Sequence, residues 1–403
     1  MRVLLRIATR NLLRNRRRTL FVVLSIAVGV TAVTGVRGFL NGLQGSLISG
    51  FVEGATGAIQ VHAKGFAQNL DAAPLRLAFP VDDVLLARVE AIDGVRAVAP
   101  RLGAPVLLAR GDASTFALSL GVDPVREPRA LARRVESVST GAFIASDDDV
   151  LVGRELLGGL KGALDDEVTL VGNDTDGVMN GVAGHVKGEL AAFTQGEKKL
   201  VLLSLARAQE LFRAEGRATE LAIAVDDLDD LDATAARVRL ALGDAYEVHT
   251  WREIATFAAD VVETQNAALD AVVFIFLVVI LFGLANALLT SVYERVREIG
   301  TMLAVGATKR QVLTLFVIES SALGLVGGFV GALVGTLIVT ALGQNGVTLT
   351  TPGASLPQHL FPFITADFLV RIVVIATLGA ALTALWPAWK ASRMSPVDAL
   401  SST

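Results

Sequence analysis

Four long apolar runs divide the chain, and they alternate with polar stretches of very different length. The runs cover residues 19–36, 271–289, 320–343 and 368–386. Each has close to the ~20 residues that an α-helix needs to cross a hydrocarbon core of ~30 Å. The pattern therefore predicts four membrane-spanning helices, with more than half of the chain lying between the first run and the second.

Short strand and helix patterns alternate within the long polar stretch. Period-two alternation predicts strands at 59–63, 95–110, 115–122, 167–171, 200–203, 220–225 and 246–250. Helical periodicity predicts helices at 81–92, 155–164, 204–212 and 231–242. This alternation favours compact α/β or ferredoxin-like lobes. We expect 111–195, which is richer in Gly and Asp, to be a second lobe inserted into the first, and a helix to run unbroken from Trp251 into the second span.

The segment between the second and third runs is amphipathic. Gly306 suits a left-handed helix end. Thr308 and Gln311, three residues apart, predict a capping box that opens the next helix. We expect a short helix that lies on the membrane surface with its charged face toward water. Its apolar stripe recurs at helical spacing, at Val292, Val296, Ile299 and Leu303.

Basic residues indicate which side of the membrane each segment faces. Residues 1–18 contain seven arginines and no acid, whereas 344–367 contain no Lys or Arg. The positive-inside rule then predicts that both termini and the loop after the second span are cytoplasmic, with 45–265 outside. A cleaved twin-arginine signal peptide is an alternative for the start, although its apolar run is long for a signal core and continues into further helical pattern.

Composition and charge narrow the function classes. The mean hydropathy is +0.56, as expected for a membrane protein. Residues 45–265 carry 34 acidic and 21 basic residues, and the remainder carries 6 acidic and 15 basic ones. An acidic outer domain with a basic membrane portion argues against nucleic-acid binding. The absence of cysteine excludes disulfides, thiolate metal sites and cysteine nucleophiles.

No motif for bond chemistry is present in the sequence. There is no Gly-Lys dipeptide and hence no phosphate loop, and no G-x-S-x-G nucleophile elbow. The acidic runs 147–149 and 226–232 do not have EF-hand spacing, so we expect solvated turns or helix starts. The four histidines lack paired metal-ligand spacing: His62, His185, His249 and His359. We therefore predict a non-catalytic chain that binds no cofactor or metal.

The third apolar run carries glycines at small-xxx-small spacing, which lets two membrane helices approach closely. Such glycines either pack the spans of one chain together or form a contact between two chains. The candidates for helix packing are Gly324, Gly328, Gly331 and Gly335.

Three motifs carry a family resemblance. They are Arg-Asn-Leu-Leu-Arg-Asn at 10–15, E-R-x-R-E-I-G-x-x-x-A-x-G-A at 294–307, and P-A-x-x-A-S-x-x-x-P-x-x-A-L at 387–400. Over essentially its whole length the chain resembles the FtsX-like/MacB-type permeases of ABC transporters. Within them it looks most like the lipoprotein-releasing (LolC/LolE-type) branch, at 38–50, 57–65 and 174–188. The implied fold is membrane α+β, with four transmembrane helices and a large two-lobed α/β extracytoplasmic domain between helices 1 and 2.

The expected segments follow from the pattern and the resemblance. They are a cytoplasmic amphipathic helix (1–18), span 1 (19–44), the extracytoplasmic domain (45–265), span 2 (266–290), a cytoplasmic coupling helix (291–311), span 3 (312–343), an extracytoplasmic loop (344–366), span 4 (367–387, ended by Pro387) and a cytoplasmic tail (388–403).

The resemblance implies that the coupling helix docks on a cytoplasmic ABC ATPase dimer, which would bind the ATP and Mg. A rigid charged helix between two spans could transmit a push, although its charges could instead only anchor the loop. The residues assigned to ATPase coupling are Glu294, Arg295, Arg297, Glu298, Ile299, Gly300, Gly306 and Ala307.

The leading functional hypothesis is a bacterial inner-membrane permease, paired with a second copy or paralogue, that releases lipoproteins or similar lipophilic cargo from the outer leaflet. A periplasmic chaperone or adaptor and membrane lipid are further expected partners. The alternatives are MacB-like efflux of a peptide, antibiotic or siderophore, and an FtsX-like signal relay to a cell-wall hydrolase. A cargo entrance, or else ordinary helix packing or lipid contact, is expected at Phe39, Leu40, Leu43, Leu47, Phe51, Val272, Phe274 and Phe276.

Overall fold

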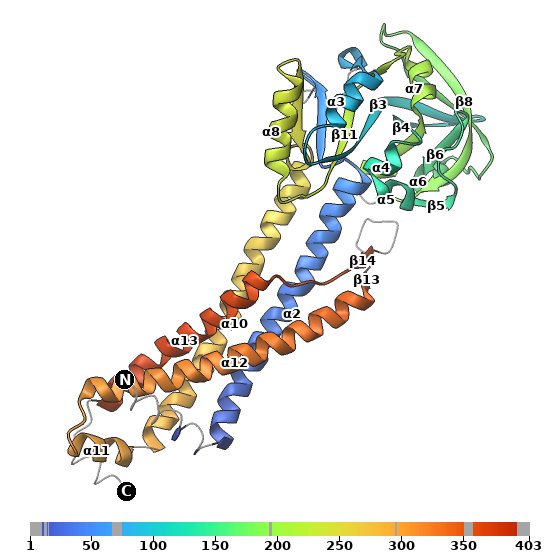
Figure 1. The fold of residues 1–403 in the computed structure, drawn as a ribbon. Coiled ribbons are helices and arrows are strands. Elements are labelled where there is room, and N and C mark those ends of the chain that lie inside the picture. Colours follow the sequence, from blue (N-terminus) through green and yellow to red (C-terminus); the bar gives the residue numbers. More distant parts are fainter. Residues whose placement is uncertain are drawn as a thin grey trace. The chain divides into compact units, whose positions relative to one another are not determined.

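The computed structural model describes residues 10–11, 14, 16–66, 75–192, 196–294, 296–349 and 358–392. The chain divides into two compact units. The membrane unit comprises Met1–Gln44, Glu263–Val347 and His359–Thr403, and the outer unit comprises Gly45–Val262 and Thr348–Gln358. Figure 1 shows long helices in the first and mixed strands and helices in the second.

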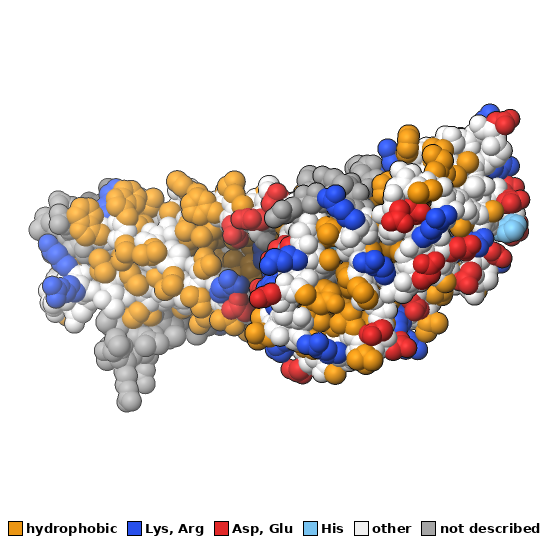
Figure 2. All heavy atoms as spheres, turned by 90° about the horizontal axis from the view of Figure 1, so that it is seen from above, with side chains coloured by type: hydrophobic (Ala, Val, Ile, Leu, Met, Phe, Trp, Pro, Cys, Tyr) orange, Lys and Arg blue, Asp and Glu red, His pale blue; other side chains and the backbone are white. Residues whose placement is uncertain are grey.

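Four helices in the described part of the chain are long and apolar enough to cross a membrane, as the sequence predicts. They are α2 (Arg16–Gly54), α10 (Thr256–Glu294), α12 (Lys309–Asn345) and α13 (Ala366–Ser392). The 39 residues of α2 span about 58 Å at ~1.5 Å per residue, well beyond the ~30 Å of a hydrocarbon core. In the space-filling view, hydrophobic side chains cover much of the visible helical surface, whereas acidic and basic side chains are interspersed over the outer unit (Figure 2).

The fourth helix continues past the predicted end of its span. Pro387 lies inside α13, which ends only at Ser392. A proline inside a helix removes one backbone hydrogen bond. Here the last turns are held by packing, because Ala388 is fully buried against Val312 and Phe316 of α12.

The glycines of the third span lie against other helices of the same chain. A Cβ added at Gly331 would lie 2.5 Å from the carbonyl oxygen of Ala27 in α2. A Cβ at Gly335 would lie 2.7 Å from Cβ of Thr34, and one at Gly324 would lie 2.7 Å from Cβ of Ala380. At Gly328 the corresponding contact is 3.2 Å to Ala376. Of the two alternatives for these glycines, the contacts seen are those of packing within one chain.

The outer unit is built on one large, mostly antiparallel sheet, which has ten strands among the described residues. The strand order is β12-β1-β11-β3-β4-β9-β6-β8-β5, and β7 pairs with β3 and β8. The pairs β4–β9 and β6–β8 are parallel. The strands are β1 (Ile59–Ala63), β3 (Val95–Arg110), β4 (Ala113–Val122), β5 (Val138–Gly141), β6 (Asp149–Gly153), β7 (Glu167–Asn173), β8 (Met179–Leu190), β9 (Leu200–Ser204), β11 (Glu220–Val225) and β12 (Tyr246–Thr250).

Short elements complete the two units. The helices of the outer unit are α3 (Asp83–Glu90), α4 (Glu127–Ala130), α5 (Ala132–Glu136), α6 (Arg154–Gly159), α7 (Leu205–Phe212), α8 (Leu231–Leu242) and α9 (Trp251–Ile254). Two-stranded pairs join β2 (Phe79–Pro80) to β10 (Arg217–Ala218), and β13 (Val347–Leu349) to β14 (Gln358–Leu360). The 3-10 turns are η2 (Leu75–Leu77) and η3 (Gly196–Lys199).

Among its described residues the outer unit has two large hydrophobic cores, which mark two lobes, and two smaller clusters. Helices α3 and α8 contribute Val89 and Val238 to one core, and α7 contributes Phe212 to the other. Strand β3 belongs to both, because Val98 lies in the first core and Leu108 in the second. The second core draws its strand and helix residues from the span 102–214, together with residue 78, so it is wider than the predicted insertion at 111–195.

Two local predictions for the outer unit are wrong. The helix expected at 155–164 ends at Gly159, after which Lys161 takes a positive φ of 50°. The helix expected to run unbroken from Trp251 is interrupted at Ala255, whose φ of −97° and ψ of 57° are not helical. The second span is therefore entered through two helices, α9 and α10.

Candidate functional site

The loop between the second and third spans forms a helix that is seated on two of the spans. This helix, α11 (Val296–Ala304), turns Ile299 inward, and that side chain is only 1 % exposed. Ile299 packs with Val312 and Phe316 of α12 and with Ala388 of α13. Arg297, on the same helix, is exposed. A force applied to the exposed face of α11 would therefore reach α12 and α13 through a packed contact.

The connection from α11 to α12 is closed by hydrogen bonds at both helix ends. Gly306 has a φ of +102°, and its N–H donates to the carbonyl of Leu303 at 3.1 Å while the N–H of Ala307 donates to that of Met302 at 2.9 Å. This pair of bonds is the Schellman motif. The two cap predictions, for Gly306 and for Thr308 with Gln311, are confirmed. The connection between the two helices is therefore short and held by hydrogen bonds.

A capping box opens α12 directly after that motif. The Thr308 side chain accepts from the N–H of Gln311 at 3.3 Å, and the Gln311 side chain accepts from the N–H of Thr308 at 2.8 Å. An open groove of about 420 Å³ lies beside the connection, with Met302 and Leu315 in its wall and Val305, 86 % exposed, on its edge. Among its described residues the site offers exposed basic side chains next to an apolar groove, and no catalytic group.

The residues assigned to ATPase coupling occupy different environments. Arg297 faces solvent, whereas Ile299 and Gly300 are buried. The buried pair therefore holds α11 in place and is not free to touch a partner. Arg295 and the side chains of Glu294 and Glu298 lie outside the described residues. Docking of an ATPase on this helix stays a prediction.

The residues assigned to a cargo entrance occupy different environments, and those on α10 do not share one face. On α10, Val272 and Phe276 are four residues apart and share a face, whereas Phe274 lies about 200° around the helix from each of them. All three are exposed, Phe274 most of all at 64 %. On α2, Phe51 packs against the first core of the outer unit. The other four residues on α2 are half-buried: Phe39, Leu40, Leu43 and Leu47.

Asp149 of the first acidic run and His62 both have structural roles. Asp149 accepts bonds from the N–H groups of Ala145 and Ser146, both at 2.9 Å, in a tight turn. His62 is fully buried and stacks on Phe66 with ring centroids 4.3 Å apart. Burial lowers the pKa of His62 below its ordinary value. Among the described residues, no group of three or more His, Asp or Glu side chains could hold a metal ion.

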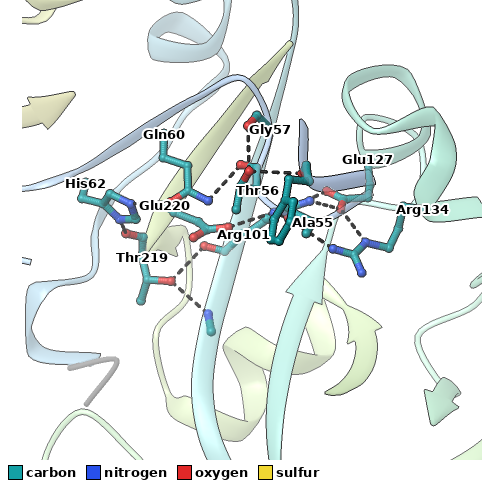
Figure 3. A network of polar contacts seen from close by, with 12 residues as sticks. Ala55, Thr56, Gly57, Gln60, His62, Arg101, Glu127, Arg134, Thr219 and Glu220 are labelled. Carbon is teal, nitrogen blue, oxygen red and sulfur yellow. Dashed lines mark hydrogen bonds and ion pairs between the residues drawn. The ribbon is translucent and has the colours of Figure 1, made fainter. Parts of the chain in front are cut away.

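A buried ionic network in the outer unit was not predicted from the sequence (Figure 3). Arg101 of β3 is 1 % exposed and donates to Glu127 through Nε at 3.0 Å and through Nη2 at 2.5 Å. It also pairs with Glu220 of β11 at 3.1 Å. The only sign of this network in the sequence is that Arg101, a charged residue, lies in the middle of an apolar strand pattern.

Two family models match the chain. The MacB-like periplasmic core domain matches residues 19–241, and the FtsX-like permease C-terminal domain matches residues 271–396. The first match alone covers more than half of the chain. This chain is an ABC transporter permease of the MacB/FtsX type. The resemblance drawn from the sequence motifs is thereby confirmed, while the lipoprotein-releasing branch stays a prediction.

Several curated relatives are similar over nearly the whole chain. The macrolide export ATP-binding/permease protein MacB of Hyphomonas neptunium is 27% identical over 98% of this chain and 60% of the relative. The protein of the same name from Wolinella succinogenes is 26% identical over 99% of this chain and 60% of the relative. An uncharacterized permease of Bacillus subtilis, YknZ, is 33% identical over 39% of this chain and 36% of its own length. The chain thus spans about 60% of the length of these MacB relatives.

Solved structures of isolated outer domains also match. The extracellular domain of YknZ matches with a TM-score of 0.34 and 14% identity over 48% of this chain and 99% of that one. The periplasmic region of MacB from Actinobacillus actinomycetemcomitans matches with a TM-score of 0.35 and 10% identity over 49% of this chain and 91% of that one.

The family assignment, together with the four apolar helices, indicates that this chain is an inner-membrane protein. It also implies, for the family in general, a cytoplasmic ATPase partner.

Proposed function

We propose that this permease converts motion produced by a separate cytoplasmic ATPase pair into movement of its outer unit, and catalyses no bond chemistry itself. The observation that carries the proposal is the seating of α11 on α12 and α13 through Ile299, with the connection from α11 to α12 closed by hydrogen bonds at both helix ends. In the proposed orientation both termini and α11 are cytoplasmic, and 45–265 is outside. Helices α2 and α10 then connect the membrane to the outer unit.

Two cargo classes are candidates, and both are amphiphilic. Similarity to MacB proteins over nearly the whole chain favours efflux of a drug-like or peptide compound taken from the extracytoplasmic side. Release of an acylated lipoprotein is the second candidate, and the exposed apolar side chains Phe274 and Phe276 suit an acyl chain. Extraction of one long acyl chain costs roughly 11 kcal/mol at ~0.8 kcal/mol per methylene, so such a release needs energy coupling.

The test is ATP hydrolysis by the reconstituted complex of the permease and its ATPase in lipid nanodiscs. Stimulation by an acylated lipoprotein, but not by its unacylated form or by a macrolide, identifies lipoprotein release. Stimulation by a macrolide or peptide alone identifies efflux. Hydrolysis by the permease in the absence of any ATPase would refute the proposal.

A further inference from the structure

The C-terminal end of α2 is held inside the outer unit by arginines. Arg101 Nη1 donates to the carbonyl of Ala55, just after the helix, at 2.8 Å, and Arg134 Nη2 donates to the same oxygen at 3.2 Å. Arg133 Nη1 donates to the hydroxyl of Ser49 at 2.6 Å. The last carbonyls of a helix lack intrahelical donors and carry the negative end of its dipole. Positive side chains therefore satisfy this end in hydrogen bonding and in charge.

The carboxylates behind these arginines fix their positions. Glu127, which is fully buried, binds Arg101 with two parallel bonds and lies 3.9 Å from Arg134. Burial alone would lower the pKa of Arg101, but the carboxylates of Glu127 and Glu220 raise it above its ordinary value. Arg101 therefore stays charged, and a bidentate pair of this kind restricts orientation as well as distance. The close-up shows the side chains converging on Ala55 (Figure 3).

Apolar packing reinforces the same joint. Val52 of α2 is 6 % exposed and belongs to the first core of the outer unit, and Ile48 and Phe51 pack against that core. One helix end is thus held by two kinds of contact at once.

The entry of α10 is built differently. The four-residue helix α9 is fixed by Trp251, which is 3 % exposed and is the one residue of α9 that is buried. Ala255 then leaves helical geometry, and α10 begins at Thr256. The N–H of Ala255 still donates to the carbonyl of Trp251 at 2.7 Å, and its carbonyl accepts from the N–H of Ala259 at 3.0 Å. Its ψ of 57° nevertheless breaks the run of helical dihedral angles, and we place the bending of α10 at this break.

We infer that the outer unit is joined to its two long helices asymmetrically. It is fixed to α2 through a charged clamp, and it is hinged to α10 at Ala255. The clamp consists of Arg101, Glu127, Arg133, Arg134 and Glu220. The outer unit then follows the end of α2 as one body, while α10 changes its angle to it. The claim that this joint transmits motion from the ATPase rests on the proposed function. The existence of the joint does not depend on it.

The chain has no cysteine, so introduced cysteine pairs can carry spin labels without background. One pair joins Glu53 of α2 to Phe116 of β4, and the other joins Asp260 of α10 to Phe116. Double electron–electron resonance on the full chain in nanodiscs should give a narrow distance distribution for the α2 pair and one at least about twofold broader for the α10 pair. Equal widths would overturn the inference.

Variants of the clamp provide the second arm. The double variant Arg101→Met/Glu127→Gln removes the central ion pair without leaving a bare buried charge in that pair, and it should broaden the α2 distribution. Arg133→Ala, at a residue on the edge of the clamp, keeps the test available if the double variant fails to fold, and it should broaden the distribution less. The control is Arg110→Met, at the other end of β3, where the half-exposed pair with Asp166 at 2.7 Å does not touch α2.

An unchanged α2 distribution in Arg133→Ala and in every folded clamp variant would refute the clamp. The measurement needs no ATPase, so it is separate from the proposed function. A fixed α2 joint that shows no response to ATP in the full complex would count against that function and leave the joint intact.

Discussion

Replacing Gly331 with alanine is the sharpest test of how the spans are packed. The added Cβ would lie 2.5 Å from the Ala27 carbonyl oxygen and 2.7 Å from Cβ of Val30, so α2 and α12 must separate. Overpacking of this kind costs about 1–3 kcal/mol. Separation also weakens the bond from the Thr31 hydroxyl to the Gly331 carbonyl, now 3.1 Å, which in membranes is worth about 0.6 kcal/mol. We expect a total loss of about 2–3 kcal/mol.

The assay is thermal unfolding of the detergent-solubilised chain, followed by the circular dichroism of its helices. The matched control is Gly35→Ala on α2, where a new Cβ meets nothing within 4 Å. In that control the alanine should be neutral or mildly stabilising, because glycine is the poorer helix former. Gly331→Ala should melt several degrees below it. Equal melting temperatures, or a higher one for Gly331→Ala, would refute the close approach of α2 to α12.

Three further predictions concern other parts of the chain. Glu298→Lys should leave membrane insertion intact but uncouple the ATPase, with Asp260→Lys as the control on the outer unit; recovery of the ATPase at wild-type yield with normal transport would contradict this. Ile299→Asp buries an unpaired charge, so amide hydrogen exchange across 296–304 should quicken by about tenfold or more, and the exposed Thr301→Asp should not produce this. Because burial lowers the pKa of His62 below 6.5, the unfolded state binds more protons than the folded state under mildly acidic conditions, and stability should fall as pH drops below about 6.5. His62→Gln should flatten that slope of unfolding free energy against pH, and an unchanged slope would exclude His62 as its source.

Local patterns were sufficient to predict the four long helices, the outer helices α3, α7 and α8, and most strands of the large sheet. The caps around Gly306 and Thr308 depend on neighbours within five residues, so their sequence determines them. Strand β8 was missed for a physical reason. Its buried positions include Gly184 and Gly188, where an added Cβ would lie 2.5 Å from Val150 and 2.9 Å from the Thr140 carbonyl oxygen. Close packing there requires glycine, and glycine removes the apolar alternation that identifies a strand.

Contacts between residues far apart in the sequence could not be predicted from local sequence patterns. The partners of Arg101 lie 26 residues away at Glu127 and 119 residues away at Glu220. The sequence shows only a charged residue in an apolar strand, not which carboxylates neutralise it. The break at Ala255 was not signalled by the sequence either, because alanine favours helix.

The central claim is that motion made by a cytoplasmic ATPase reaches the outer unit through this chain. The most direct measurement is the ATP-dependent change in distance between a spin label at Phe116 of the permease and one at the same position of a second copy, in the complete complex with its ATPase. We predict a change on ATP binding in the wild-type complex, and none in Glu298→Lys under conditions where the ATPase still hydrolyses ATP. A wild-type distance that is the same with and without ATP would contradict the account.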